Sequence, residues 1–183
     1  ITGFNKNIEF TQKEIWGSVL LGSLTTLAEL VPEHQLMVRL LLQGDASVQN
    51  KIDVTAKKID DAFKTLVVDG KKYEKVLKID QKTLKSMKLE EIHYSKALAM
   101  WQELRKHYKN NSTVQNDVEH EMVIKPVNAM IQWVGETSNI ILDPDLDSHY
   151  MANVAIVTLP KTLSALSEFL LYGESVVFKG FRS

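Results

Sequence analysis

The 183-residue chain contains no cysteine and little glycine or proline, with eight and four residues. Without cysteine, the chain cannot form disulfide scaffolds, thiolate zinc sites or iron–sulfur clusters, and thiol catalysis is excluded. All-β and α/β folds need many tight turns and connections, so the sparse glycine and proline favour long helices instead. We find no uninterrupted apolar run of about 18 residues, and therefore expect no membrane-spanning segment within the chain.

Neither sign of charge dominates the composition. Twenty-two basic and 23 acidic side chains give a formal net charge of −1. A nucleic-acid-binding protein would need a basic excess or a basic stripe, so we expect no nucleic-acid partner. The length and the apolar content of 44% fit one globular domain over residues 1–183. Because the chain begins at Ile1 without an initiator methionine, we expect it to be part of a larger protein.

Apolar residues recur at alternating steps of three and four, which is the spacing of a helix with one buried face. Four stretches have this pattern, at 20–41, 52–77, 97–141 and 152–177. The first stretch stops before Gly44, and residues 45–47 could cap the next helix. The pattern keeps its phase through a possible interruption at 69–71, whereas 110–112 breaks the spacing, which resumes from Val123.

The four stripes predict an all-α fold, a long antiparallel up-down-up-down four-helix bundle with breaks in the second and third helices. Turns are expected near 44–47, 85–90 and 142–147. Four passes would place both ends of the chain at the same end of the bundle. The alternative is a five-helix arrangement, in which 110–112 is a true reversal and the two ends lie apart.

Three sequence patches occur in a fixed order along the chain. The first comprises IEFTQKEIWG at 8–17, EHQ at 33–35 and LQGDAS at 42–47; the second is SNIILDPDLDSHYM at 138–151; the third is Leu159-Pro160 with Gly173. With these patches the chain resembles the extracytoplasmic helical sensor region of bacterial transmembrane receptors. These receptors are methyl-accepting chemotaxis proteins, sensor histidine kinases and diguanylate cyclases. The LDPDLDS run is the most specific part of the resemblance.

The resemblance implies a non-enzymatic signal-input domain without a cofactor. It would be the periplasmic part of an inner-membrane protein, excised from between two transmembrane helices, and would sense a small molecule or a periplasmic protein. A membrane-proximal HAMP relay and a cytoplasmic output domain would follow. The resemblance also implies a homodimer, and we expect its interface on the first helix, where Val19, Leu30, Leu36 and Leu40 add a second apolar face. The alternative is a helical protein-interaction module that binds no small ligand.

The candidate ligand-binding residues are His34, Gln35, Arg39, Asn139 and Tyr150. His34 occupies a core position of the first stripe, either as a hydrogen-bonded core residue or as a ligand or proton contact. The planar fork of Arg39 would suit a carboxylate or nitrate, although a helical arginine is usually solvated. Sensor regions of this type often have Arg at the position of Gln35, and often Tyr-Tyr at 149–150, where this chain has His-Tyr.

A short polar run before the distal turn, Thr137 to Asn139, could meet His34 from the facing helix or could end its own helix. In the turn itself, Asp143, Asp145 and Asp147 could bind Ca²⁺, but a Pro-stiffened turn that caps the next helix fits the sequence better.

A metal-binding, di-iron-like bundle is a remote alternative. Such bundles use two Glu-x-x-His pairs and two further glutamates that point inward. The chain contains Glu90-x-x-His93 and Asp117-x-x-His120. The first pair lies at an expected turn and the second has Asp in place of Glu, so we expect no metal site. Trp101 and Trp133 are expected in the core.

Overall fold

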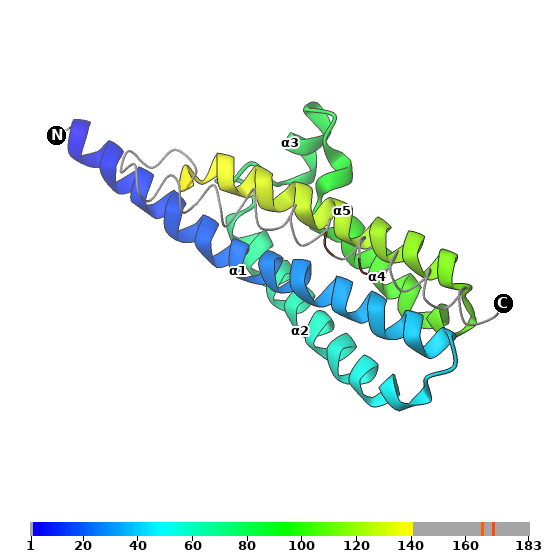
Figure 1. Cartoon of the computed structure of the whole chain (residues 1–183). Coiled ribbons are helices and arrows are strands. Elements are labelled where there is room, and N and C mark those ends of the chain that lie inside the picture. The colour runs from blue at the N-terminus through cyan, green and yellow to red at the C-terminus, as the bar shows by residue number, and fades with distance from the viewer. Residues whose placement is uncertain (1, 141–165, 167–169, 171–183) are drawn as a thin grey trace.

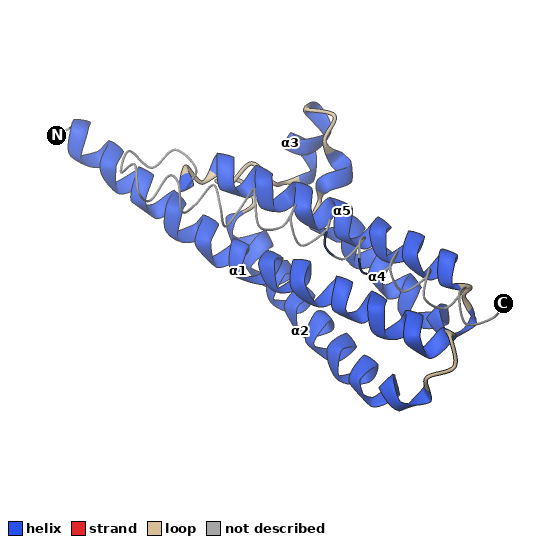
Figure 2. Cartoon of the chain, in the orientation of Figure 1, coloured by secondary structure: helices blue, strands red, loops and turns tan. Residues whose placement is uncertain are grey.

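The computed structural model describes residues 2–140, Leu166 and Leu170, with side chains described from Phe10 onward. All regular structure in this part of the chain is helical (Figure 2). The helices are α1 (Thr2–Leu42), α2 (Gln49–Tyr73), α3 (Gln81–Ser86), α4 (Tyr94–His107) and α5 (Thr113–Thr137), with 3-10 turns η1 (Ala46–Val48), η2 (Glu90–Ile92) and η3 (Tyr108–Asn110). The all-α prediction is therefore confirmed for the described residues.

Helix α1 is the common partner of the assembly, because it packs against α2 and also against α5. Helix α4 packs mainly on α5. The chain reverses direction between α1 and α2 and again between α4 and α5, so neighbouring long helices are antiparallel (Figure 1). The short helix α3 projects from the side of this bundle (Figure 1).

The prediction of one continuous third pass over 91–141 is wrong, because the chain reverses at 108–112. Asn111 and Ser112 have extended backbones, and the Ser112 hydroxyl accepts a hydrogen bond from the Gln115 amide to cap α5. The structure thus contains the reversal that we considered as the alternative. The predicted turn at 142–147 lies outside the described residues, and so does the predicted fourth helix at 152–177 apart from Leu166 and Leu170.

The predicted break at 69–71 is also absent, since α2 continues through Gly70 to Tyr73. Gly70 is needed there for packing: a Cβ at this position would lie 2.7 Å from the Tyr94 ring. Beyond Tyr73 the chain leaves the bundle, and Lys78 turns it with a positive φ of 54°. The Asp80 carboxylate then caps α3 by accepting from the Thr83 amide.

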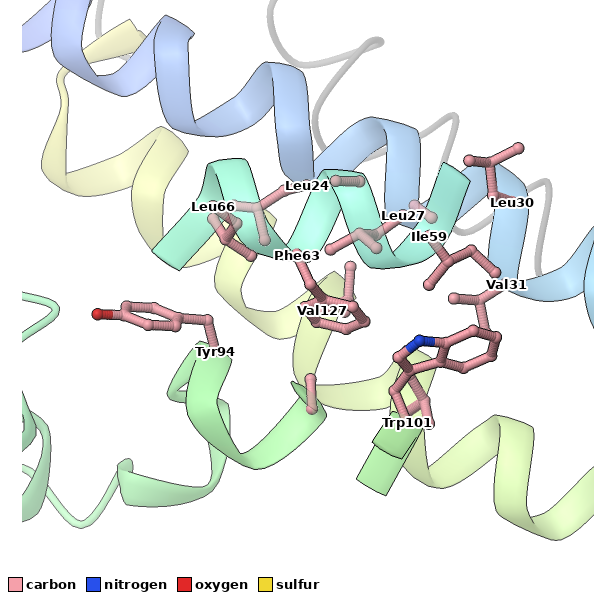
Figure 3. Packing of buried hydrophobic residues seen from close by; sticks show 14 of the residues in the cluster. Leu24, Leu27, Leu30, Val31, Ile59, Phe63, Leu66, Tyr94, Trp101 and Val127 are labelled. Atoms are coloured by element: carbon pink, nitrogen blue, oxygen red, sulfur yellow. The ribbon is translucent and has the colours of Figure 1, made fainter. Parts of the chain in front are cut away.

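The core lies where α1, α2, α4 and α5 meet. Leu24 and Leu27 of α1, Phe63 of α2 and Val127 of α5 converge there (Figure 3). Trp101 of α4 is fully buried, as expected, while Trp133 is half-buried. Burial of each large apolar side chain stabilises the fold by about 1.5–3 kcal/mol. The first two stripes predicted from the sequence are therefore core faces.

By length and composition, residues 10–42 of α1 could cross a membrane, with a mean hydropathy of 1.3 in their most apolar stretch. The sequence analysis predicts no such segment, because the chain has no uninterrupted apolar run of about 18 residues. Half of this stretch is buried inside the structure. Its hydropathy therefore has an explanation within the bundle, where α1 serves as the core helix.

Candidate functional site

A layer of polar side chains crosses the interface of α1 with α5 near the C-terminal end of α1. We call it the polar layer, and it consists of His34, Gln35 and Arg39 of α1 with Asn116, Asp117 and His120 of α5. His34, Asn116 and His120 are fully buried, and Arg39 is nearly so. Because the two helices are antiparallel, two short segments 86 residues apart meet face to face.

The two histidines form a direct hydrogen bond. Their Nδ1 (His34) and Nε2 (His120) atoms are 2.8 Å apart, and His120 Nδ1 lies 2.7 Å from the carbonyl oxygen of Asn116. A carbonyl oxygen only accepts, so His120 carries its proton on Nδ1 and its neutral Nε2 accepts from His34 Nδ1. This order leaves His34 Nε2 as an acceptor, and it has no hydrogen-bond partner in the structure.

Both imidazoles are held in the neutral form. Burial, together with smaller electrostatic contributions from His120 and Arg105, lowers the pKa of His34 to about 3. Burial likewise lowers the pKa of His120 to about 4, against the hydrogen bond to the Asn116 carbonyl and the charges of Asp117 and Glu119. At neutral pH the pair is therefore an uncharged donor–acceptor chain inside the bundle.

Aromatic rings from the α4 side surround His34. The Trp101 ring meets it edge-on at a centroid distance of 4.9 Å, and the Tyr108 ring does so at 5.7 Å. Trp101 Nε1 donates to Asp60 Oδ1 over 2.7 Å, and Arg105 pairs with the same carboxylate. The polar layer is thus connected through Trp101 to α2.

The guanidinium of Arg39 is paired with an internal carboxylate. Its Nη1 contacts Asp117 Oδ2, and Asp117 Oδ1 accepts from Gln35 Nε2 at 3.1 Å and from Asn116 Nδ2 at 3.3 Å. Arg39 is therefore not the solvated arginine that is usual on a helix. An anion bound through Nη1 would have to compete with Asp117.

The polar layer contains two acceptor atoms that are buried but not engaged by its own donors. His34 Nε2 and Asn116 Oδ1 are both buried without a hydrogen-bond partner in the structure. Buried acceptors of this kind are usually satisfied by water or by a ligand donor. Chemically, the layer is suited to receive an O–H or N–H group.

A second feature lies on the outer face of the α4–α5 hairpin. Glu119 accepts from His107 Nε2 at 3.1 Å, Asn111 Nδ2 at 2.7 Å and Gln115 Nε2 at 3.0 Å. Burial opposes its ionisation, but these hydrogen bonds outweigh burial and lower the pKa of Glu119. A pocket of about 200 Å³ opens beside it, lined by Met100, Glu103, Leu104, His107, Glu119 and Met122.

The structure brings three of the five predicted ligand-binding residues together: His34, Gln35 and Arg39. It does not bring Asn139 to them, because α5 meets His34 through His120, nineteen residues earlier in the chain. At a helical rise this separation is about 28 Å. Ser138 instead approaches Gly17 of α1, where a Cβ would lie 2.2 Å from the Ser138 Cβ. Tyr150, Asp143, Asp145 and Asp147 lie outside the described residues.

The two acid-x-x-His pairs have separate roles. His93 caps α4, with its Nδ1 accepting from the Ser95 amide at 3.2 Å, whereas His120 binds His34. Within residues 10–140, no three of the His, Asp and Glu side chains are grouped so as to hold a metal ion. The Asp117-x-x-His120 motif was visible in the sequence, but its role opposite Arg39 and His34 was not predicted.

The chain matches no family model, no curated protein and no solved structure in the comparisons with known proteins. Its function must therefore be argued from its own residues and their geometry.

Proposed function

We propose that the chain is the extracytoplasmic signal-input domain of a bacterial transmembrane receptor of the chemotaxis or two-component type, and that it is not an enzyme. The observation that carries the proposal is the polar layer within the contact between α1 and α5. Helix α1 is continuous over its 41 residues and extends from this layer, near its C-terminal end, towards the other end of the bundle. The sequence patches of receptor sensor regions support the same interpretation.

The polar layer provides what a switch between helix positions requires. Apolar packing is non-directional, whereas the His34–His120 and Arg39–Asp117 contacts each need one register of α1 against α5. Sliding α1 by one turn would break both contacts together. A ligand or partner protein that prefers one register would shift α1, by an amount limited by its differential affinity.

The proposal extends to residues outside the described part, where 152–177 would form a further long helix on the bundle. The reversal at 108–112 adds a pass to the chain, so the argument from four passes, which placed both chain ends at one pole, no longer holds. The periplasmic location between two membrane helices therefore depends on the sequence resemblance. Apolar spans of about 20 residues on both sides in the parent gene are the expected finding, and their absence would contradict this topology.

We also propose a homodimer through α1, although its available surface is smaller than the sequence suggested. Val19 is exposed, and Ile15 one turn earlier is exposed as well. Leu30, in contrast, is buried within the chain, and Leu36 and Leu40 are half-buried. Sedimentation velocity over a concentration series measures this association directly.

The signal-input proposal is tested by a thermal-shift screen against amino acids, organic acids and inorganic anions. A compound that binds the folded state at 100 times its dissociation constant stabilises it by about 2.7 kcal/mol, which raises the melting temperature by several degrees. A shift that is lost in Asn116→Leu, but kept in the surface variant Lys57→Gln, would place the ligand at the polar layer. If no compound of any class shifts the melting temperature, the helical protein-interaction module becomes the better interpretation.

A further inference from the structure

Seven lysines are concentrated in the last turn of α2 and in the segment that leaves the bundle after it. We call residues 71–88 the lysine knob; its lysines are Lys71, Lys72, Lys75, Lys78, Lys82, Lys85 and Lys88. Glu74 and Asp80 are its only acidic residues, so the knob carries a formal charge of +5. The whole chain carries −1, so the remainder carries −6. The near-neutral composition therefore conceals a strong separation of charge.

The knob is folded with its lysines outward. Leu77, Ile79 and Leu84 are fully buried and anchor its inner side, and Trp133 Nε1 of α5 donates to the Lys78 carbonyl at 3.2 Å. All seven lysines are exposed, and none pairs with a carboxylate in the described part of the chain. Glu90 and Glu91 follow in η2, where Glu91 pairs with Lys96.

Aliphatic side chains are exposed among these charges. Val76 and Met87 belong to the knob, and Val68 lies one turn before Lys71 and Lys72 on α2. The exposed surface therefore combines positive charge with small apolar contacts on α3 and its flanking turns. Figure 1 shows α3 as the part of the structure that stands farthest out from the side of the long helices.

The residue types narrow the class of partner. Single-stranded nucleic acids are bound through exposed aromatic rings and arginines, and protein hot spots are enriched in Trp, Tyr and Arg. The knob contains no arginine, and its one aromatic residue, Tyr73, is stacked on Trp16 at 5.6 Å. Lysines with aliphatic neighbours fit a diffuse layer of lipid headgroups, to which each lysine near the surface adds about 1 kcal/mol.

We propose that the lysine knob binds the surface of a bilayer that contains anionic lipids, with its lysines among the phosphates and Met87 and Val76 at the headgroup boundary. The remainder of the chain is negatively charged and is repelled by the same surface, so the knob is the side that approaches the membrane. This inference goes beyond signal input and does not depend on it.

The test is co-sedimentation of the whole chain with vesicles of phosphatidylglycerol and phosphatidylcholine at equal amounts, in low salt. We expect binding that weakens steeply as salt is added, because screening reduces the attraction. The triple variant Lys75→Gln/Lys82→Gln/Lys85→Gln should bind on the order of 100-fold more weakly. The matched control Lys57→Gln/Lys58→Gln/Lys64→Gln removes the same charge from exposed positions of α2 and should change binding less than about threefold.

Helical circular dichroism and melting temperature verify that both triple variants are folded. Absence of binding to anionic vesicles in low salt would overturn the proposal. So would equal losses in the two triple variants, since the attraction would then follow total charge and not the knob. Binding to duplex DNA or polyphosphate without binding to vesicles would likewise overturn it, in favour of a soluble polyanion.

Discussion

His34 and His120 show how much a buried position changes the acid–base behaviour of a single side chain. Each has its pKa lowered far below 6.5, to about 3 and about 4, so the folded state binds fewer protons than the unfolded state. The free energy of unfolding is therefore unaffected by protonation of these two histidines above pH 6.5, where both are neutral in the folded and the unfolded state. It declines as the pH falls towards the folded pKa values, because the unfolded state then binds protons that the folded state does not. The relevant window is therefore pH 6.5 to about 3.

We predict that the free energy of unfolding falls by about 1.4 kcal/mol per pH unit for each of the two histidines below pH 6.5. Urea denaturation at pH 7, 6, 5 and 4.5 measures this slope. The double variant His34→Leu/His120→Leu removes both partners and should lose most of it. His107→Gln alters a partly exposed histidine and should keep the slope; equal slopes in wild type and double variant would contradict the prediction.

Two Arg–Asp pairs in the same chain differ in burial and allow a controlled comparison. The side chains of Arg39 and Asp117 are 10% and 26% exposed, whereas those of Arg105 and Asp60 are 37% and 46% exposed. We predict a coupling energy of about 1–3 kcal/mol for Arg39–Asp117 and below about 1 kcal/mol for Arg105–Asp60. Double-mutant cycles with Arg→Met and Asp→Asn measure both, and a larger value for the exposed pair would refute this ranking.

At the scale of the helix, the exposed glycine and the two buried glycines described in α1 and α2 have opposite effects on stability. Gly22 is exposed and a Cβ there meets nothing within 4 Å, whereas a Cβ at Gly17 or Gly70 would collide with Ser138 or with the Tyr94 ring. Gly22→Ala should therefore stabilise the protein by about 0.5–1 kcal/mol, because alanine loses less backbone entropy in a helix. Gly17→Ala and Gly70→Ala should each destabilise it by about 1–3 kcal/mol. Thermal melts of the three variants distinguish the two effects, and a stabilised Gly17→Ala would contradict the close approach of α1 and α5.

The sequence was sufficient for the buried faces of α1 and α2 but not for the direction of the chain. Leu104 and Tyr108 precede the reversal and Val123 and Val127 follow it, and all four are buried. The spacing of apolar residues shows which face of a helix is buried. It does not show whether the next helix continues in the same direction or returns antiparallel to it. The local signal for the turn was Ser112, which caps α5. Our prediction gave more weight to the periodic pattern and therefore favoured one continuous pass.

At the scale of the whole molecule, the sequence predicted the α1 side of the candidate site but not the α5 side. Stripe position identified His34 as a core residue, but its partner His120 lies 86 residues away and nothing local indicates that α1 faces α5. The lysine knob was missed for another reason. Net charge is an average over the chain, and the acidic residues elsewhere cancel the seven lysines in number but not in space.

The distance along the chain between α1 and its partner affects biosynthesis. The α4–α5 hairpin closes over a short separation, with His107 only 12 residues from Glu119, so it can form early. Helix α1, by contrast, is translated 86 residues before the segment that covers His34. At ordinary translation rates this interval lasts roughly 4–17 s. Until α4 and α5 have been translated, α2 is the described helix available to cover the apolar side of α1. During that time the nascent chain presents the apolar face of α1 to chaperones or to the translocation machinery.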